Sequence, residues 1–315
     1  KPAFDQDLTL VVDDWRLTEE GQIHEQSLGA LHEWAHGGRS GRWITVNGAY
    51  RPQMKIRAGE RVRLRLVNVC NASIYALKLE GLKADLIALD GQPVAPRDVS
   101  SEPMLFSPAQ RIDLAVAADP NHQGKASLRS LRRDGSDELA GFVIEPSSSG
   151  AGKNPDPIRL PDNPLPKTLD RSGALNIKVK MEGGAMGRLR SAVYKGRKLG
   201  IDELIQVKSI WALAGVTGLP EKPLFSARRG QSVVLNLINE TAWPHPMHIH
   251  GFHFSVLERN GKPMAGAPWR DTELIMPRET VLLGFVADNP GKWLLHCHTL
   301  EHAAAGMITW FEVTA

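Results

Sequence analysis

The sequence predicts an all-β protein made of two copies of one sandwich or barrel domain, and three observations lead to this fold class. Short runs rich in Val, Leu and Ile recur along the 315 residues, separated by Gly, Pro, Asn-Gly and Asp-Gly turns. No stretch sustains the periodicity of an amphipathic helix. The second half of the chain also repeats the spacing of the first half.

The composition narrows the class of protein. The chain contains 42% apolar and 23% charged residues, as ordinary globular proteins do, and it is long enough for two cores. A formal net charge of +3 gives no support for a nucleic-acid partner. Because no run approaches the roughly 18 apolar residues of a membrane helix, we expect no membrane partner. Lys1 does not open a signal peptide and resembles a cut end.

The first copy is assigned to residues 1–145. Its predicted strands include TLVVDDW, then AGERVRLRLVN after Trp43, then LKLEGLKADLIALDGQP and RIDLAVAAD. The landmarks of the second run are Gly59, Val62, Leu64, Leu66 and Asn68. Cys70 follows among apolar residues. If Cys297 binds a metal, Cys70 has no disulfide partner, so we predict that Cys70 is buried as a small apolar side chain.

Residues 146–169 separate the two copies. Pro146 to Pro166 contains six prolines together with Ser, Gly, Asn and Asp, a composition typical of an extended linker. The second copy is therefore assigned to residues 170–315.

The second copy reproduces the first with different polar residues. After Trp211 comes RGQSVVLNLIN, whose landmarks are Gly230, Val233, Leu235, Leu237 and Asn239. MHIHGFHFSVLERNGKP then aligns with LKLEGLKADLIALDGQP of the first copy. In this alignment Lys78 and Glu80 occupy the positions of His248 and His250. The first copy also has no counterpart of the HCH tripeptide, so we predict that it binds no metal and has a structural role.

Two other stretches leave alternatives open. Residues 178–198 carry seven basic residues, one acid, Met181 and Met186. A methionine pair can dock Cu(I), but a solvated loop with gap-filling methionines is favoured. In HEWAHGGRSGRW, His32 and His36 would share a face if helical and could hold a metal, whereas the neighbouring glycines favour a loop without one.

The densest group of metal-binding residue types is KWLLHCHTLEHAAAGM, residues 292–307. Because side chains alternate across a strand, His296 and His298 are predicted to face one side and Cys297 the other. A thiolate, imidazoles and a weak thioether are the ligands of a blue-copper centre. The upstream run HPMHIHGFHF supplies further imidazoles at His245, His248 and His250.

HPMHIHG and HCHTLEHAAAGM resemble the two C-terminal copper motifs of the multicopper oxidases, HPxHxHG and HCHxxxHxxxxM. TLVVDDW, ITVNGAYRP, RLRLVNVCNAS and LIALDGQPV are similar to the second domain of bacterial laccase-like members, and WRDT with the HCH strand is similar to the third. The resemblance implies two cupredoxin-like Greek-key domains, copper as the cofactor, and a periplasmic or secreted oxidoreductase.

The family pattern implies a role for each matched residue. It assigns His245, Cys297, His302 and axial Met307 to type 1 copper, His248 to type 2 copper, and His250, His296 and His298 to the type 3 pair. It also implies that Cys297, His296 and His298 are the catalytic residues, because the cysteine joins both histidines through its backbone.

The resemblance further implies one-electron oxidation of phenolic, aromatic or metal-ion reductants at the type 1 copper, coupled to four-electron reduction of O2 to water. The family takes four more histidines from an N-terminal cupredoxin domain, in two H-x-H motifs that this chain lacks. We therefore expect the second and third domains of an oxidase, without turnover until the missing domain supplies its ligands. The alternative is a copper-binding electron-transfer protein of two cupredoxin domains.

Four residues near these motifs are not part of the ligand pattern, and their roles are interpreted separately. His253 is interpreted as a supporting residue. Asp271 and Glu301 have either a substrate or proton role, or they are a strand-end charge and an exposed turn carboxylate. Ala303 stands where many bacterial members have an acidic residue implicated in proton supply, so the resemblance identifies no proton route here.

Overall fold

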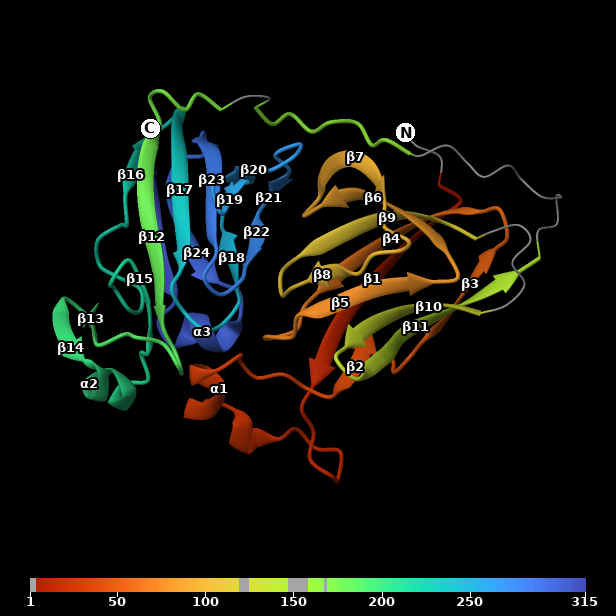
Figure 1. Cartoon of the computed structure of the whole chain (residues 1–315), viewed down its shortest axis with the longest axis horizontal. Helices are drawn as coiled ribbons and strands as arrows, with labels where there is room; N and C mark the ends of the chain where they lie inside the picture. Colours follow the sequence, from red (N-terminus) through yellow and green to blue (C-terminus); the bar gives the residue numbers. More distant parts are fainter. Residues whose placement is uncertain (1–3, 119–124, 147–157, 167–168) are drawn as a thin grey trace. The chain divides into compact units, whose positions relative to one another are not determined.

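The computed structural model describes residues 4–118, 125–146, 158–166 and 169–315, and it contains two compact β units (Figure 1). The first unit comprises Lys1–Ile23 and Ser40–Asn163, and the second comprises His24–Arg39 and Pro164–Ala315. Among the described residues, no helix has both the length and the apolar character needed to cross a membrane.

The first unit packs two sheets around one core. One sheet has the strand order β2-β1-β4-β9-β6-β7 and the other β3-β11-β10-β5-β8. The strands are β1 (Gln6–Trp15), β2 (Trp43–Val46), β3 (Gln53–Arg57), β4 (Arg61–Asn68), β5 (Tyr75–Glu80), β6 (Lys83–Leu89), β7 (Gln92–Asp98), β8 (Met104–Phe106), β9 (Arg111–Ala117), β10 (Lys125–Arg132) and β11 (Gly135–Glu145). A 3-10 turn, η1 (Glu25–Ser27), and α1 (Leu31–Ala35) interrupt this series but belong to the second unit.

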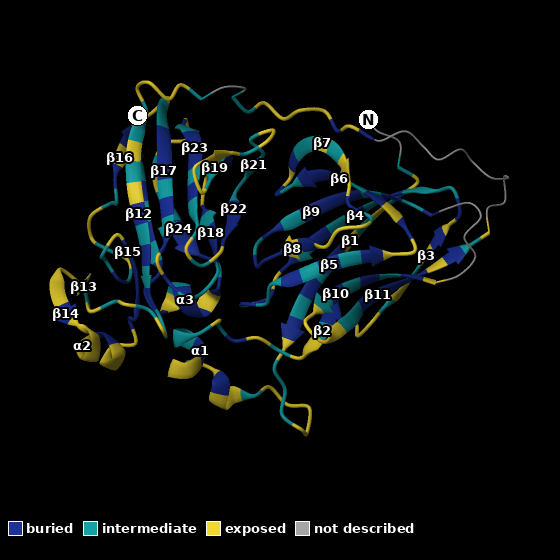
Figure 2. Ribbon diagram, in the orientation of Figure 1, coloured by how far each residue is buried: buried dark blue, intermediate teal, exposed yellow. Residues whose placement is uncertain are grey.

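Strand β4 shows why these sequences form sheets. Its buried residues alternate with partly exposed arginines, so Val62, Leu64 and Leu66 all enter the core. Each such aliphatic side chain contributes about 1.5–3 kcal/mol on burial. On the other face, Arg65 makes a bidentate ion pair with Asp7 of β1, with both N–O distances at 2.7 Å. The alternation thus gives the sheet an apolar inner face and a charged outer face. Figure 2 shows how buried and more exposed residues follow one another along the strands of the unit.

The second unit has the same architecture. Its larger sheet has the order β15-β12-β17-β23-β19-β20, with β21 paired to β19, and its smaller sheet has the order β16-β25-β24-β18-β22. The elements are β12 (Leu175–Gly183), β13 (Ser191–Tyr194), β14 (Arg197–Gly200), α2 (Ile201–Gln206), β15 (Trp211–Leu213), β16 (Ser226–Arg228), β17 (Gln231–Asn239), β18 (His245–Ile249), β19 (Phe254–Arg259), β20 (Lys262–Pro263), β21 (Trp269–Arg270), β22 (Thr272–Ile275), β23 (Thr280–Ala287), β24 (Gly291–Cys297), α3 (Leu300–Ala304) and β25 (Ile308–Thr314). Strands β13 and β14 form a separate hairpin.

The predicted all-β fold class and the internal repeat are both confirmed. Taken in chain order, each strand of the first unit has a counterpart at the same place in the sheets of the second. Even the parallel pairs recur: β1 with β4 corresponds to β12 with β17, and β3 with β11 corresponds to β16 with β25. Two copies of one Greek-key sandwich therefore account for the described strands, apart from the β13–β14 hairpin and β21.

Strand register identifies which residues of the first unit stand in the place of the histidines and cysteine. Tyr75 is equivalent to His245, because each is the first residue of its strand to pair with the edge strand, β8 or β22. Ser130 of β10 is equivalent to Cys297 of β24, because the two lie opposite equivalent residues of β5 and β18. A phenol and a hydroxyl thus occupy the positions of an imidazole and a thiol.

Residues 24–39 differ from the sequence-based domain assignment. We placed them in the first domain and interpreted HEWAHGGRSGRW as a loop, but Leu31–Ala35 form α1 and pack with the second unit. Trp34 and Ala35 contact its core, and the Trp34 carbonyl accepts a 2.7 Å hydrogen bond from Trp211 Nε1. Burial of Trp34 against that core, which sequence spacing does not show, stabilises the helical turn.

The predicted loop at residues 178–198 is also wrong in part. It contains the end of β12 and the whole of β13, and Met181 is fully buried in the core whereas Met186 is 75% exposed. Of the predicted linker, residues 147–157 and 167–168 lie outside the described residues. Its residues 158–163 belong to the first unit, where Asn163 Nδ2 donates to the Gly91 carbonyl at 3.2 Å.

Asn239, the last residue of β17, organises the turn that leads to β18. Its Nδ2 donates to the carbonyls of Trp243 at 2.7 Å and Ile275 at 3.1 Å. Its Oδ1 accepts the backbone N–H of Thr241 at 2.9 Å and the hydroxyl of Thr241 at 2.8 Å. Asn68 bonds to three backbone groups in the same way at the end of β4.

We expect Asn239→Ala to lower the free energy of unfolding of the second unit by about 2–4 kcal/mol, because buried donors and acceptors lose their partners. Urea unfolding followed by circular dichroism measures this change. The control is Asn176→Ala at an exposed position of β12, where we expect a change within about 0.5 kcal/mol. Equal effects of the two substitutions would contradict the structural role of Asn239.

Candidate metal centre

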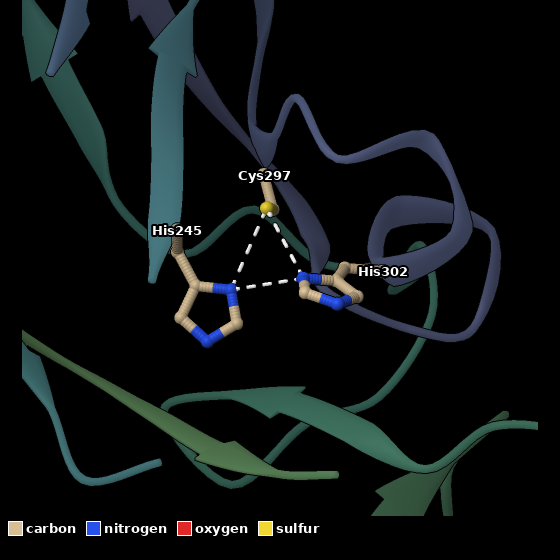
Figure 3. Close-up of side chains that lie close together, drawn as sticks. All are labelled: His245, Cys297 and His302. Atoms are coloured by element: carbon tan, nitrogen blue, oxygen red, sulfur yellow. Dashed lines mark hydrogen bonds between the residues drawn. The ribbon is translucent and has the colours of Figure 1, made fainter. Parts of the chain in front are cut away.

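Three elements of the second unit bring two imidazoles and a thiol together. His245 begins β18, Cys297 ends the neighbouring strand β24, and His302 lies in α3. Figure 3 shows their side chains pointing toward a common point. Because α3 follows β24 after two residues, the chain turns back at once and returns His302 to the cysteine.

The donor atoms have the spacing of metal ligands. His245 Nδ1 lies 3.1 Å from His302 Nδ1, and Cys297 Sγ lies 3.5 Å and 3.6 Å from these two nitrogens. The circle through the three atoms has a radius of about 2 Å, close to the length of metal–imidazole and metal–thiolate bonds. An ion at its centre would therefore contact all three.

Hydrogen bonds on the far side of each ring orient the two imidazoles. His302 Nε2 donates to the His36 carbonyl at 2.6 Å, so its proton is on Nε2 and its Nδ1 carries a lone pair. Thr241 Oγ1 lies 2.8 Å from His245 Nε2 and from Asn239 Oδ1, and 3.0 Å from the Trp243 carbonyl. When the hydroxyl donates to one of these oxygens, it accepts the Nε2 proton of His245 and leaves the Nδ1 lone pair for a metal ion.

Burial sets the protonation states of the three groups. All three side chains are 0% exposed. Burial lowers the pKa of His302 to about 4, and burial with the nearby His302 holds the pKa of His245 well below its ordinary value. Burial raises the pKa of the Cys297 thiol to about 12. The imidazoles are thus neutral and ready to bind a metal at neutral pH, whereas the thiol must release its proton to the solvent on binding.

Surrounding groups close the site. The Trp211 ring packs against His302, with centroids 4.3 Å apart, and meets His245 edge-on at 5.1 Å. The Thr299 N–H donates to Cys297 Sγ at 3.4 Å. Gly306, with φ of +116°, lies so close to Trp211 that a Cβ would collide with the Trp211 carbonyl.

Met307 is held beside the same group. Its side chain is fully buried, its carbonyl accepts from the Cys297 N–H at 3.0 Å, and its N–H donates to the His302 carbonyl at 2.9 Å. Its backbone thus connects two of the three donors, and its thioether lies in the same core cluster as Cys297.

The remaining histidines gather on the other face of β24. His250 Nε2 lies 3.0 Å from His296 Nε2, a separation typical of two ligands of one ion. His296 Nδ1 donates to the Cys297 carbonyl at 2.8 Å, and His248 Nδ1 donates to the Asp271 carbonyl at 3.0 Å. Because carbonyls only accept, the Nε2 atoms of His296 and His248 carry lone pairs.

His298 completes this four-histidine face, formed by His248, His250, His296 and His298. Its ring centroid lies 5.6 Å from that of His296 and 5.7 Å from that of His248. Its Nδ1 is buried and, among the described residues, has no hydrogen-bond partner. A buried nitrogen without a partner costs free energy unless a ligand satisfies it. Burial lowers the pKa of His296 to about 4 and that of His298 below its ordinary value, so both are neutral.

The structure therefore separates the HCH tripeptide as alternation predicts. Cys297 enters the buried group with His245 and His302, whereas its two neighbours join the four-histidine face. The two faces also differ in exposure, since His245 is fully buried and His250 is exposed.

Supporting residues include some that the sequence analysis named and some that it missed. Asp271 Oδ2 lies 3.8 Å from His253 Nε2, which fits a supporting role for that histidine. Glu301 is 8% exposed, so the alternative of an exposed turn carboxylate was wrong. Sequence reasoning missed Thr241 and Trp211 as neighbours of the metal ligands, although Thr241 follows the repeat landmark Asn239 by two residues.

Comparisons with known proteins indicate the family of the chain. Two family models described as multicopper oxidase match residues 6–126 and 197–315. Multicopper oxidase MmcO of Mycobacterium tuberculosis is 31% identical over 255 residues, which cover 81% of this chain and 47% of MmcO. Iron multicopper oxidase fer1 of Mycosarcoma maydis is 24% identical, over 82% of this chain and 47% of fer1. The chain thus spans about half the length of these curated relatives.

A solved structure shows the same relation in three dimensions. The crystal structure of a multicopper oxidase from Pseudomonas thermotolerans superposes with a TM-score of 0.79 and 30% identity, covering 100% of this chain and 69% of that one. Lac15 from a marine microbial metagenome is also 30% identical, with a TM-score of 0.69 over 99% of this chain and 67% of that one.

Thr241→Val provides a test of the buried group. The substitution removes the hydrogen-bond partner of His245 Nε2, so we expect the affinity for Co(II) or Cu(II) to fall about 10–100-fold. Competition titration against a chelator measures it. Thr309→Val, at another buried threonine of the second unit, is the matched control and leaves the affinity unchanged. Equal metal affinities of the Thr241→Val and parent chains would show that Thr241 does not support metal binding by His245.

Proposed function

The chain belongs to the multicopper oxidase family, and we propose that it provides the type 1 copper site and half of the trinuclear copper site of a laccase-like oxidase. His245, Cys297 and His302 hold the type 1 copper, with Met307 as the axial ligand. His248 serves the type 2 copper, and His250, His296 and His298 serve the type 3 pair. The whole enzyme oxidises phenolic, aromatic or metal-ion reductants one electron at a time and reduces O2 to water.

The observation that carries this proposal is the convergence of two Nδ1 atoms and a thiol on one point. The distances of 3.1–3.6 Å between the donor atoms suit a copper ion, and the ligand types are those of a blue-copper centre. A core without a metal would gain more from apolar side chains, because the burial of three polar groups at one point costs free energy.

Bound copper supplies the one-electron chemistry, and the chain supplies the connection between the two sites. Cys297 is bonded through its own backbone to His296 and His298, so a few covalent bonds join the buried group to the four-histidine face. The Cys297 carbonyl also accepts from His296 Nδ1 at 2.8 Å, which adds a hydrogen bond to this path. Complete burial of Sγ keeps water away from the thiolate.

Asp271 contributes to the four-histidine face. Its backbone carbonyl fixes the ring of His248, while its carboxylate lies 3.6 Å from His248 Nδ1 and 3.8 Å from His253 Nε2. We place this carboxylate among the groups that hold protons for O2 reduction, a role that Ala303 has no side chain to perform.

The four-histidine face is an incomplete set for the trinuclear site, so we propose that a further cupredoxin domain contributes the remaining ligands. Exposure of His250 supports this, because the ring is available to a partner. The four histidines also argue against the alternative of a pure electron-transfer protein, which would need only the buried group.

Copper loading tests the proposal. We expect the Cu(II)-loaded chain to absorb strongly in the visible range through sulfur-to-copper charge transfer, and Cys297→Ser to abolish that absorption, because its hydroxyl replaces the thiolate. Cys70→Ser, the same substitution at a buried cysteine of the first unit, is the control and keeps the absorption. A colourless copper-loaded parent chain would contradict the type 1 assignment. Metal counting separates the two functions: more than one copper per chain supports the oxidase, and a single copper supports electron transfer.

Met307→Leu tests the axial ligand. Removing a thioether donor favours Cu(I) over Cu(II), so we expect the redox potential of the type 1 site to rise. Direct titration of the visible absorption against redox mediators measures it. Met247→Leu, at a fully buried methionine of the same core cluster, is the control and leaves the potential nearly unchanged. A fall in potential for Met307→Leu would contradict the assignment.

A further inference from the structure

The β13–β14 hairpin and α2 form a surface of the second unit that contains none of the predicted metal ligands. The hairpin has no counterpart among the described strands of the first unit, and Figure 2 shows most of α2 and β14 exposed. We propose that this surface docks on an anionic lipid bilayer, with its basic residues at the lipid phosphates and its apolar side chains in the outer layer of the membrane. The proposal does not rest on copper or on the oxidase function.

Apolar side chains extend around α2 beyond the side that faces the core. Leu204 is fully buried and packs with Ala192 and Leu199 of the hairpin, which anchors the helix. Ile201 and Ile205, four residues apart and therefore neighbours on the helix surface, are 37% and 41% exposed. A surface helix of a globular protein ordinarily carries polar residues at such positions. The two isoleucines thus leave apolar surface in contact with solvent, which a bilayer would cover.

Further aliphatic side chains lie beside α2. Val207 follows the helix and lines one hollow together with Leu219, and both are exposed. Leu28 is exposed as well, and it precedes Gly29, whose carbonyl accepts a 3.1 Å hydrogen bond from Lys208 Nζ. A single exposed aliphatic side chain is normal, but a group of them bordered by charged residues marks a binding surface.

Basic residues border this apolar surface. Residues 188–208 contain six Lys and Arg and two acidic residues, so their net charge of +4 exceeds the +3 of the whole chain. Lys195, Arg197 and Lys198 are exposed on the hairpin, and Lys208 lines the same hollow as Lys195. Within the part of the chain that the structure describes, none of these four residues forms an ion pair. Their charges are therefore available to lipid phosphates.

The residue types favour a lipid surface over an acidic protein. Protein interfaces obtain most of their binding energy from Trp, Tyr and Arg, and they are depleted in Lys. Here the exposed apolar side chains are Ile, Leu and Val, and lysines outnumber arginines among the four basic residues. Aliphatic side chains beside basic ones are typical of surfaces that lie in the interface of an anionic bilayer. The expectation of no membrane partner rests on the lack of a spanning segment, which such docking does not need.

Binding is tested by sedimentation of the copper-free full chain with phosphatidylcholine vesicles that do or do not contain phosphatidylglycerol. We expect binding to the anionic vesicles to be at least about tenfold tighter than to the neutral ones, and to weaken as salt is added. Lys195→Gln/Lys198→Gln lowers the affinity for the anionic vesicles at least about tenfold. Lys83→Gln/Lys125→Gln, at two exposed lysines of the first unit, makes the same change in net charge and is the matched control that keeps the affinity.

Ile201→Thr/Ile205→Thr tests the apolar part of the surface. We expect the affinity for the anionic vesicles to fall at least about tenfold, because each substitution removes apolar area that the membrane covers. Leu105→Thr, at an exposed leucine of the first unit, is the control and keeps the affinity. A second measurement uses an environment-sensitive dye attached at Ile205→Cys, since both native cysteines are buried. We expect its emission to shift to shorter wavelength when the anionic vesicles bind.

Equal binding to the two kinds of vesicle would overturn the proposal, and so would an unchanged emission of the dye. Loss of binding in the lysine variant with full binding in the isoleucine variant would also overturn it, because attraction to head groups alone needs no apolar surface. Binding to soluble polyglutamate and not to vesicles would assign the surface to an acidic protein instead. These outcomes are separate from failure of the proposed function, because none of the measurements needs copper.

Discussion

The candidate site depends on the pairing of β18 with β24. In this register Met247 lies opposite Cys297 and His248 opposite His296, so side-chain alternation sends the cysteine inward and both neighbouring histidines outward. A shift by one residue would put the histidines into the core and the thiol on the open face. The hydrogen bonds of Asn239 hold the turn before β18 and β22 together, and they therefore keep His245 at the start of its strand.

The first unit shows the same fold with other residues at the positions of His245 and Cys297. At the equivalent place, Cys70 Sγ lies 3.4 Å from the Tyr75 hydroxyl, so the two polar groups satisfy each other. In the second unit Thr241 occupies the place of Cys70, since the N–H of each donates to the asparagine two residues before it, and its hydroxyl lies 2.8 Å from His245 Nε2. One fold thus contains a core whose polar groups bond to each other and a core in which two imidazole nitrogens and a thiol converge on one point. Such a local conflict is expected at functional sites.

Much of this could be predicted from the sequence, because the deciding signals are local. Alternation gave the all-β class and the two faces of the HCH tripeptide, and the spacing around Asn68 and Asn239 gave the repeat. Sequence reasoning failed where tertiary contacts decide. Glycines beside His36 favour a loop, yet the packing of Trp34 against the second core forms a helical turn. Glu301 looks like a solvated carboxylate in sequence, but the turn back to His302 buries it.

Residues 24–39 illustrate the same point with a functional consequence. They precede most of the first copy in the chain, yet the His36 carbonyl sets the tautomer of His302 and the Trp34 carbonyl anchors the ring that covers it. Both contacts use backbone oxygens, so they depend on where the segment lies and not on its side-chain types. The ligand-ready state of His302 is therefore a property of the fold, because a carbonyl can only accept and leaves Nδ1 free for the metal whatever residue stands at position 36.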